Sequence, residues 1–394
     1  MFFEQFPGQR SVRAEVARTI LLFGSACEHP PTFAPEAMKP GWFEAISDGL
    51  SLDEYVESIF LISVGAQNSS GAFTPSWLDG PGFKGLDEVI SFEAVRRTFS
   101  EHLVVSASSF KVVNLRFRGS VPSTQKKFAF NPLTDTPFIE GIAALPIAPW
   151  CQAAIAKATP PAIYHLGVRA LDAGFTNDLG HVFQHYVGRQ LELINGERSI
   201  LPEVRYGPKK SSVDSCDWFL DLPGLLVMIE CKARQPIESL RTGGTDWLRS
   251  VEDSIGKGIA QLNRSNSAIE RIGSTDPRID TTKRRVGIVV TLEPFYVDQN
   301  WLIRDQLAVS EFPVGAASIM EMEMLAMLSA DELANALSDA AASSEGGVML
   351  LSLALDAAAG RENPLLVSTW ESIPLFARVE AAATRLRAEV SDRG

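Results

Sequence analysis

One carboxylate stands before a predicted turn, and a second carboxylate and a lysine stand after it. Asp217 lies about as far before Pro223-Gly224, a turn signal, as Glu230 lies after it. Leu225 to Ile229 is a short apolar run, which predicts a buried strand. In such a hairpin Asp217 faces Glu230, and Lys232 shares the face of Glu230 because side chains alternate along a strand. Buried charges are costly unless they are paired or bind a cation, so this trio predicts a Mg²⁺ site.

Two other acids compete with Asp217 for this role. Asp221 has the same strand parity as Asp217 but sits at the turn, where acids are common. Asp214 has the opposite parity and would point to the other face. We therefore rank Asp217 first and keep Asp214 and Asp221 as alternatives.

The pattern of an acid, a gap and Glu-x-Lys resembles the PD-(D/E)XK superfamily of restriction-endonuclease-like nucleases, over roughly residues 175–295. The resemblance implies an α/β fold whose core runs helix, three-strand meander, helix, strand, with a mixed sheet flanked by helices. Matching segments occur in the same order: a helix from Leu179 to Ile194 capped by Asn177 or Asp178, strands at Ile200–Tyr206, Ser212–Leu220 and Leu225–Lys232, a helical stripe from Trp247 to Ile272, and a strand at Arg285–Leu292.

The resemblance also implies a chemistry, the hydrolysis of phosphodiesters with Mg²⁺ or Mn²⁺. Asp217 and Glu230 would be metal ligands together with the backbone carbonyl of Cys231. Lys232 would orient or help to deprotonate the attacking water, or stabilise charge on the phosphate. Relatives often place a further acid on the first helix, just after a Phe, and here Gln184 stands there. Its amide brings no charge, so the number of metals stays open.

The second helical stripe carries polar residues on its opposite face. Gln261 corresponds to a position that the family often places close to the metal, and we expect it in the catalytic site. Lys257 and Arg264 share its helix face and are candidates for nucleic-acid binding or for a solvated surface. Arg234 and the pair Lys209-Lys210 are weaker candidates for phosphate contacts.

Composition limits the class of protein. A chain of 394 residues with 45% hydrophobic residues predicts a globular protein of about two or three domains. We expect an N-terminal α+β domain over 1–165, the nuclease-like domain over 166–300 and a mainly helical region over 301–394. No apolar run is long enough to cross a bilayer, no secretion signal is evident, and the four cysteines are scattered, so we expect a cytoplasmic protein.

The flanks of the nuclease-like segment offer helix and strand patterns but no motif. Helices are predicted at Val12–Phe23, Met320–Leu337, Gly347–Ala359 and Trp370–Val390, and strand-like segments at Lys111–Arg118 and Lys126–Phe130. No phosphate-binding GxxxxGK[ST] loop occurs, so any translocation must come from another protein.

The net charge of −12 is unevenly distributed. Residues 177–292 contain 16 Lys and Arg against 15 Asp and Glu, net +1; removing these from the totals of 36 and 48 leaves 20 and 33, net −13, elsewhere. This pattern favours modest intrinsic affinity for DNA, or delivery by a protein partner or regulatory ligand.

The first hypothesis is a DNA endonuclease, by fold-level analogy the effector of a bacterial anti-phage or restriction system. The alternatives are a catalytically inactive binding or scaffolding subunit and an unrelated interaction protein; RNA as substrate and homo-oligomer formation stay open.

Overall fold

A computed structural model describes residues 11–83, 85–119, 123, 130–235, 249, 251–296, 307, 309–344 and 348–391. Within these ranges the chain forms two compact units. Residues 29–33 and 179–363 form the first, here called the sheet unit, and residues 11–28, 34–178 and 364–391 form the second, the helical unit. Each unit draws on separate stretches of chain, and the three consecutive domains expected from the sequence stay a prediction.

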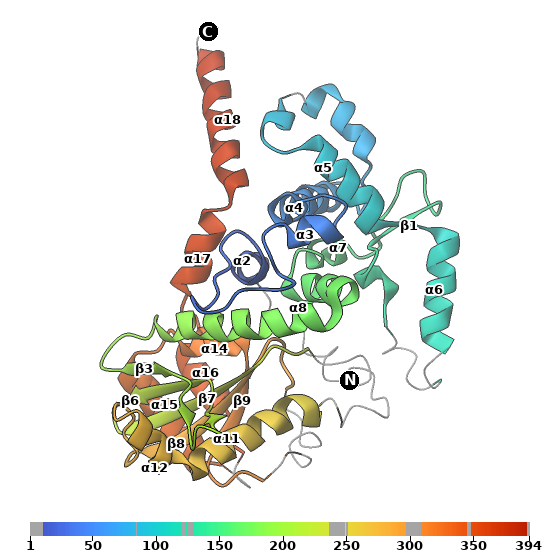
Figure 1. The fold of residues 1–394 in the computed structure, drawn as a ribbon. Coiled ribbons are helices and arrows are strands. Elements are labelled where there is room, and N and C mark those ends of the chain that lie inside the picture. The colour runs from blue at the N-terminus through green and yellow to red at the C-terminus, as the bar shows by residue number, and fades with distance from the viewer. Residues whose placement is uncertain are drawn as a thin grey trace. The chain divides into compact units, whose positions relative to one another are not determined.

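The sheet unit is built around a mixed sheet of five strands in the order β3-β6-β7-β8-β9 (Figure 1). β3 pairs antiparallel with β6 and β6 antiparallel with β7, whereas β7–β8 and β8–β9 are parallel. A separate two-stranded ribbon joins β4 to β5. The strands are β3 Ser199–Pro202, β4 Arg205–Tyr206, β5 Val213–Asp214, β6 Trp218–Leu222, β7 Leu225–Lys232, β8 Arg284–Thr291 and β9 Val314–Ser318.

The predicted hairpin is present. β7 has the predicted bounds, Leu222 pairs with Leu225 across the turn, and Gly224 takes a φ of 71° that a side chain would disfavour. β8 differs from its prediction by one residue at each end. The strand predicted over Ile200–Tyr206 is instead two short strands, because Pro202 ends β3 and has no N–H to continue a ladder.

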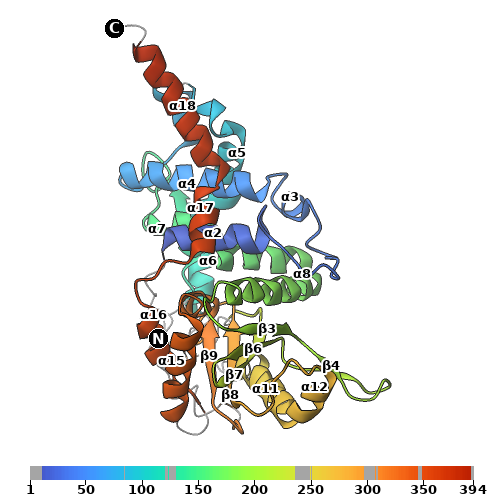
Figure 2. The ribbon, with the colours of Figure 1, turned by 90° about the vertical axis from the view of Figure 1, so that its left-hand side faces the viewer.

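One face of the sheet is covered by the helices that follow β7. A π-helical turn, Glu252–Gly256, leads into α11, Lys257–Ser267, and α12, Ile269–Thr275. Figure 2 shows α11 and α12 on one side of the strands and α15 and α16 on the other. The core on the α11 side joins sheet and helix residues, among them Leu201, Phe219, Leu226, Met228, Ile259, Leu262 and Ile272. Trp247 and Leu248 of the predicted stripe lie outside the described residues.

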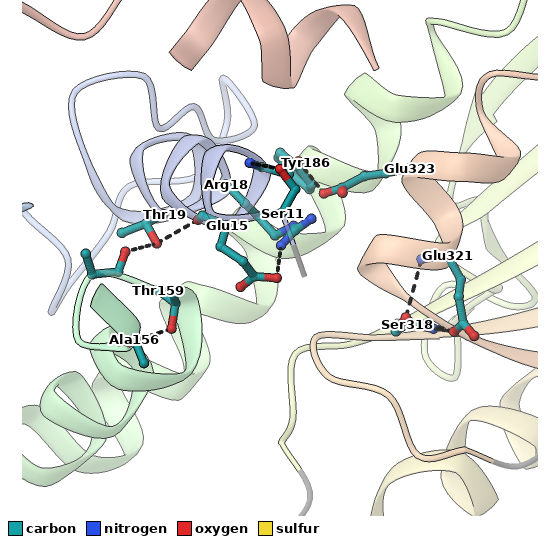
Figure 3. Close-up of polar contacts among 12 residues, drawn as sticks. Ser11, Glu15, Arg18, Thr19, Ala156, Thr159, Tyr186, Ser318, Glu321 and Glu323 are labelled. Atoms are coloured by element: carbon teal, nitrogen blue, oxygen red, sulfur yellow. Dashed lines mark hydrogen bonds and ion pairs between the residues drawn. The ribbon is translucent and has the colours of Figure 1, made fainter. Parts of the chain in front are cut away.

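The C-terminal half of α8, Pro160–Leu191, belongs to the sheet unit together with three later helices. The Tyr186 hydroxyl donates to Glu323 Oε1 of α14 at 2.7 Å, and Ser318 caps α14 in a reciprocal pair with Glu321 (Figure 3). The predicted caps of the first helix are wrong, because α8 runs through residues 177 and 178; Asp178 accepts hydrogen bonds from the N–H groups of residues 37 and 38 instead. The three helices are α14 Ile319–Leu325, α15 Ala330–Ala342 and α16 Ser352–Ala358.

The helical unit begins with α2, which has the predicted bounds. Its buried Glu15 pairs with Arg18 at 2.9 Å, and the Thr19 hydroxyl donates to the Ala158 carbonyl (Figure 3). Two short strands, β1 and β2, pair in parallel. The elements are α2 Val12–Phe23, α3 Trp42–Ile46, α4 Leu52–Asn68, α5 Phe92–Arg97, β1 Val104–Ser106, α6 Ala107–Gly119, β2 Phe138–Glu140, α7 Gln152–Ala156, α17 Pro364–Glu371 and α18 Pro374–Ser391.

One strand prediction in this unit is wrong. Lys111–Arg118 lies inside the helix α6, where the β-branched Val112 and Val113 favoured a strand on local propensity alone. The strand predicted over Lys126–Phe130 falls outside the described residues except for its last position. Among the described residues, no helix is long and apolar enough to cross a membrane.

Candidate active site

Asp217 and Glu230 meet where β6 begins and β7 nears its end. Trp218 pairs with Ile229, and the same register one step further places Asp217 opposite Glu230. Asp217 Oδ2 accepts a hydrogen bond of 2.6 Å from the N–H of Cys231. The hairpin geometry expected from the turn signal therefore brings the two carboxylates together.

Lys232 completes the group. Its Nζ donates to Glu230 Oε1 at 2.6 Å, and the two side chains are 21% and 2% exposed. The second carboxylate oxygen of Glu230, Oε2, is buried and has no hydrogen-bond partner among the described residues. An acceptor left in this state costs free energy, so the site has an unmet demand for a proton or a cation.

Burial dominates the electrostatics of both acids. It raises the pKa of Glu230 to about 8, with the charge of Asp217 adding to the rise and Lys232 opposing it. It raises the pKa of Asp217 to about 6, against the lowering effects of the Cys231 N–H and of Lys232. At neutral pH Glu230 therefore stays mostly protonated while Asp217 is mostly ionised, and a bound cation would favour the ionised form of both groups.

α11 supplies the polar groups that face this end of the sheet. The Gln261 amide donates to the carbonyl of Ser215 at 3.3 Å, so it contacts the segment that leads into Asp217. The positive charge of Arg264 is among the influences that lower the pKa of Glu230. Lys257 is exposed and its Nζ pairs with Asp253 at 2.7 Å. No contact joins it to the two carboxylates among the described residues.

The structure places the remaining predicted contacts away from the carboxylates. Gln184 touches the site only through its backbone, whose carbonyl accepts from Trp218 Nε1 at 3.0 Å. Trp218 pairs with Ile229 and shares its face, whereas Glu230, the next residue of β7, points to the other face. α8 therefore covers the face opposite Glu230. Among the described contacts none joins the Gln184 amide to the two carboxylates, and its expected ligand role is not supported by this placement.

Three bases proposed for phosphate contacts are exposed. Arg234 lies just beyond β7, and its N–H donates to the carbonyl of Lys232 at 2.7 Å. Lys209 and Lys210 lie in the loop between β4 and β5. Arg234 is therefore near the site along the chain, whereas the two lysines depend on the ribbon for their position.

The two competing acids are engaged elsewhere. Asp221 pairs with Lys283 at the opposite end of the hairpin. Asp214 is exposed on the β4–β5 ribbon, with its Oδ1 at 3.6 Å from Arg205 Nε. Asp217 is thus the acid of the three that lies beside Glu230.

Glu203 is an acid that the sequence argument overlooked. Pro202 pairs with Trp218, and one step further along the register Glu203 stands opposite Asp217. The pKa of Glu203 is raised by burial and by Asp214, and its charge in turn contributes to the raised pKa of Asp217. The sequence signal for Glu203 is its position directly after the end of a strand. That signal was hidden because the predicted strand, Ile200–Tyr206, continued past Pro202, where β3 ends.

The donor set fits a hard cation with an open coordination shell. Among the described residues, no group of three or more His, Cys, Asp or Glu side chains is placed to hold a metal ion. Asp217, Glu230 and the Cys231 carbonyl would instead supply a partial shell of oxygens. Mg²⁺ and Mn²⁺ accept such shells because water and substrate phosphate complete them, whereas structural Zn²⁺ needs four protein ligands.

Comparison with known proteins adds no relative. No family model, no curated protein and no solved structure matches this chain.

Proposed function

We propose that this protein is a Mg²⁺- or Mn²⁺-dependent nuclease with a PD-(D/E)XK-like core. The observation that carries the proposal is the convergence of Asp217, Glu230 and Lys232 at one sheet end, with a buried and unpartnered Glu230 oxygen. The strand order supports it as well, since two antiparallel pairs followed by a parallel partner of β7 agree with the core that the resemblance implies.

The side chains would divide the work as follows. Asp217, Glu230 and the Cys231 carbonyl would hold the cation, which when bound supplies Lewis-acid activation of a water and of the phosphate. Lys232 would leave its pairing with Glu230 to hold the attacking water or a phosphate oxygen. Gln261 would fix the Ser215 carbonyl and so the approach of the chain to Asp217.

DNA is the substrate class that we favour over RNA, in the setting of a bacterial anti-phage or restriction effector. This choice rests on the resemblance alone. The near-neutral charge of residues 177–292 within an acidic chain supports modest intrinsic affinity for either nucleic acid. A protein partner would then bring the enzyme to its substrate, or a regulatory ligand would activate it.

One observation favours an inactive binding subunit instead. The helix position that supplies a further acid in many relatives is Gln184, and it lies on the opposite face of the sheet. Glu203, which is exposed, weakens this alternative only through its charge, which acts on Asp217 from a different element.

Cleavage of nucleic acid tests the proposal. Supercoiled plasmid and labelled RNA are incubated with the purified protein in Mg²⁺, Mn²⁺ or EDTA. The wild type should cut in a metal-dependent manner, and Asp217→Asn and Lys232→Met should each lose on the order of 100-fold or more. Asp221→Asn is the matched control, since Asp221 lies on the same strand at the other end and should retain activity. Metal-independent cutting, or equal activity in all variants, would contradict the assignment.

A further inference from the structure

α6 presents an unusual surface for this acidic chain. Its exposed residues include three bases and three aliphatic side chains, of which Val112, at 69%, and Leu115, at 60%, are more exposed than Val113, at 38%. Lys111, Arg116 and Arg118 are also exposed, and none of them has an acidic partner among the described residues. No residue of α6 is buried.

Helical spacing places the three bases, Val112 and Leu115 on one side of the helix. Positions 111, 115 and 118 follow the i, i+4, i+7 pattern and positions 112 and 116 lie beside them, so the five occupy an arc of about half the helix circumference. The other side of the helix carries Phe117, whose ring lies 4.7 Å from that of Phe130. The basic and aliphatic arc therefore faces away from that aromatic contact.

The surrounding sequence has the opposite charge balance to the whole chain. From His102 to Thr134 there is no Asp or Glu, although the chain contains 48 of them in 394 residues, and the same stretch contains Lys111, Arg116, Arg118, Lys126 and Lys127. Exposed aliphatic side chains among bases mark an interaction surface, and the charge selects an anionic occupant.

We propose that this arc of α6 binds the phosphate backbone of nucleic acid; the choice of nucleic acid rests on the proposed function. The three bases would contact phosphates without regard to sequence, while Val112 and Leu115 would pack on sugar or base edges. A second copy of the chain is disfavoured, because a two-fold contact would set α6 against α6 and bring like charges together.

The experiment measures binding apart from cleavage. A fluorescein-labelled DNA duplex is titrated in EDTA, so that nothing is cut, and anisotropy is recorded over a range of salt. Changing Lys111, Arg116 and Arg118 to Gln should weaken binding at least about tenfold and reduce the slope of log K against log salt by about 2 to 3. Val112→Ser with Leu115→Ser should weaken binding and leave the slope unchanged.

A matched control separates position from net charge. Arg13, Lys39 and Arg271 are exposed bases outside α6 in the sequence, and changing these three to Gln removes the same charge. The affinity should then change by less than it does in the α6 variant. Equal effects of the two triple variants, or an α6 variant that binds as the wild type does, would overturn the proposal.

Two further outcomes are decisive. Loss of binding to vesicles of phosphatidylcholine and phosphatidylserine with unchanged DNA binding would assign α6 to a lipid surface and refute the proposal. DNA binding that depends on α6 in a protein that never cuts would uphold this inference while the nuclease proposal fails, so the two can be told apart.

Discussion

The proposed chemistry depends on a carboxylate, that of Glu230, whose pKa is raised by burial. Glu230 is nearly inaccessible to solvent, pairs one oxygen with Lys232 and leaves the other without a partner among the described residues. Placing Asp217 opposite adds a like charge. Such a pair weakens the fold when both acids are charged, unless a cation compensates them.

The stability of the metal-free protein should therefore depend on Glu230 and on pH. Its folded pKa, about 8, is raised above the ordinary 4.5. Between these values the folded state holds a proton that the unfolded chain has released, so the group's contribution falls as pH rises through this window. At about 1.4 kcal/mol per pKa unit the change is on the order of a few kcal/mol.

Urea unfolding in EDTA measures this effect. The free energy of unfolding of the wild type should decline between pH 5 and pH 8 relative to that of Glu230→Gln, which cannot ionise. Parallel pH profiles for the two proteins would show that Glu230 is not held in the buried state described here.

At the scale of elements, the site depends on how closely α8 packs against the start of β6. A Cβ on Gly188 would lie 2.4 Å from the Trp218 ring, so only glycine permits this approach of helix and strand. Trp218 immediately follows Asp217. The close contact thus fixes the strand end that carries the first carboxylate.

Substitution of two glycines in the same helix tests this seating. Gly188→Ala should destabilise the protein by about 1–3 kcal/mol through overpacking and reduce metal-dependent cleavage. Gly180→Ala is the control, because nothing lies within 4 Å of its Cβ position, and it should be neutral or stabilising by up to about 1 kcal/mol. Thermal unfolding and the plasmid assay report both effects. Equal stability of the two variants would argue against the Gly188 contact.

The elements also show what the sequence can and cannot predict. α2, β7 and β8 were predicted closely because apolar runs and turn signals mark them locally. α6 was mistaken for a strand because propensity cannot reveal that a segment will stand exposed as a helix. Gln184 was expected at the site from the resemblance. Its actual position could not be predicted, because a position along a helix does not say which face of the sheet that helix will cover. Glu203 was missed because its place depends on the register of β3 against β6.

At the scale of the whole molecule, the charge balance differs from one segment of the chain to another. The chain carries −12, yet residues 177–292 are close to neutral and α6 lies in an acid-free stretch. A polyanionic substrate would be repelled by most of the surface and attracted to a few places. This arrangement is consistent with an enzyme that binds nucleic acid through limited, salt-sensitive contacts.

Direct titration of Mn²⁺ tests the central claim most closely, because it asks whether these side chains bind a cation without requiring the right substrate. Calorimetry at pH 8, which is above the pKa of Asp217 and close to that of Glu230, should show binding to the wild type that is lost in Glu230→Gln and in Asp217→Asn. Asp214→Asn, an exposed acid on the neighbouring ribbon, should bind as the wild type does. The absence of Mn²⁺ binding in the wild type, or identical binding in all four proteins, would contradict a metal site at Asp217 and Glu230.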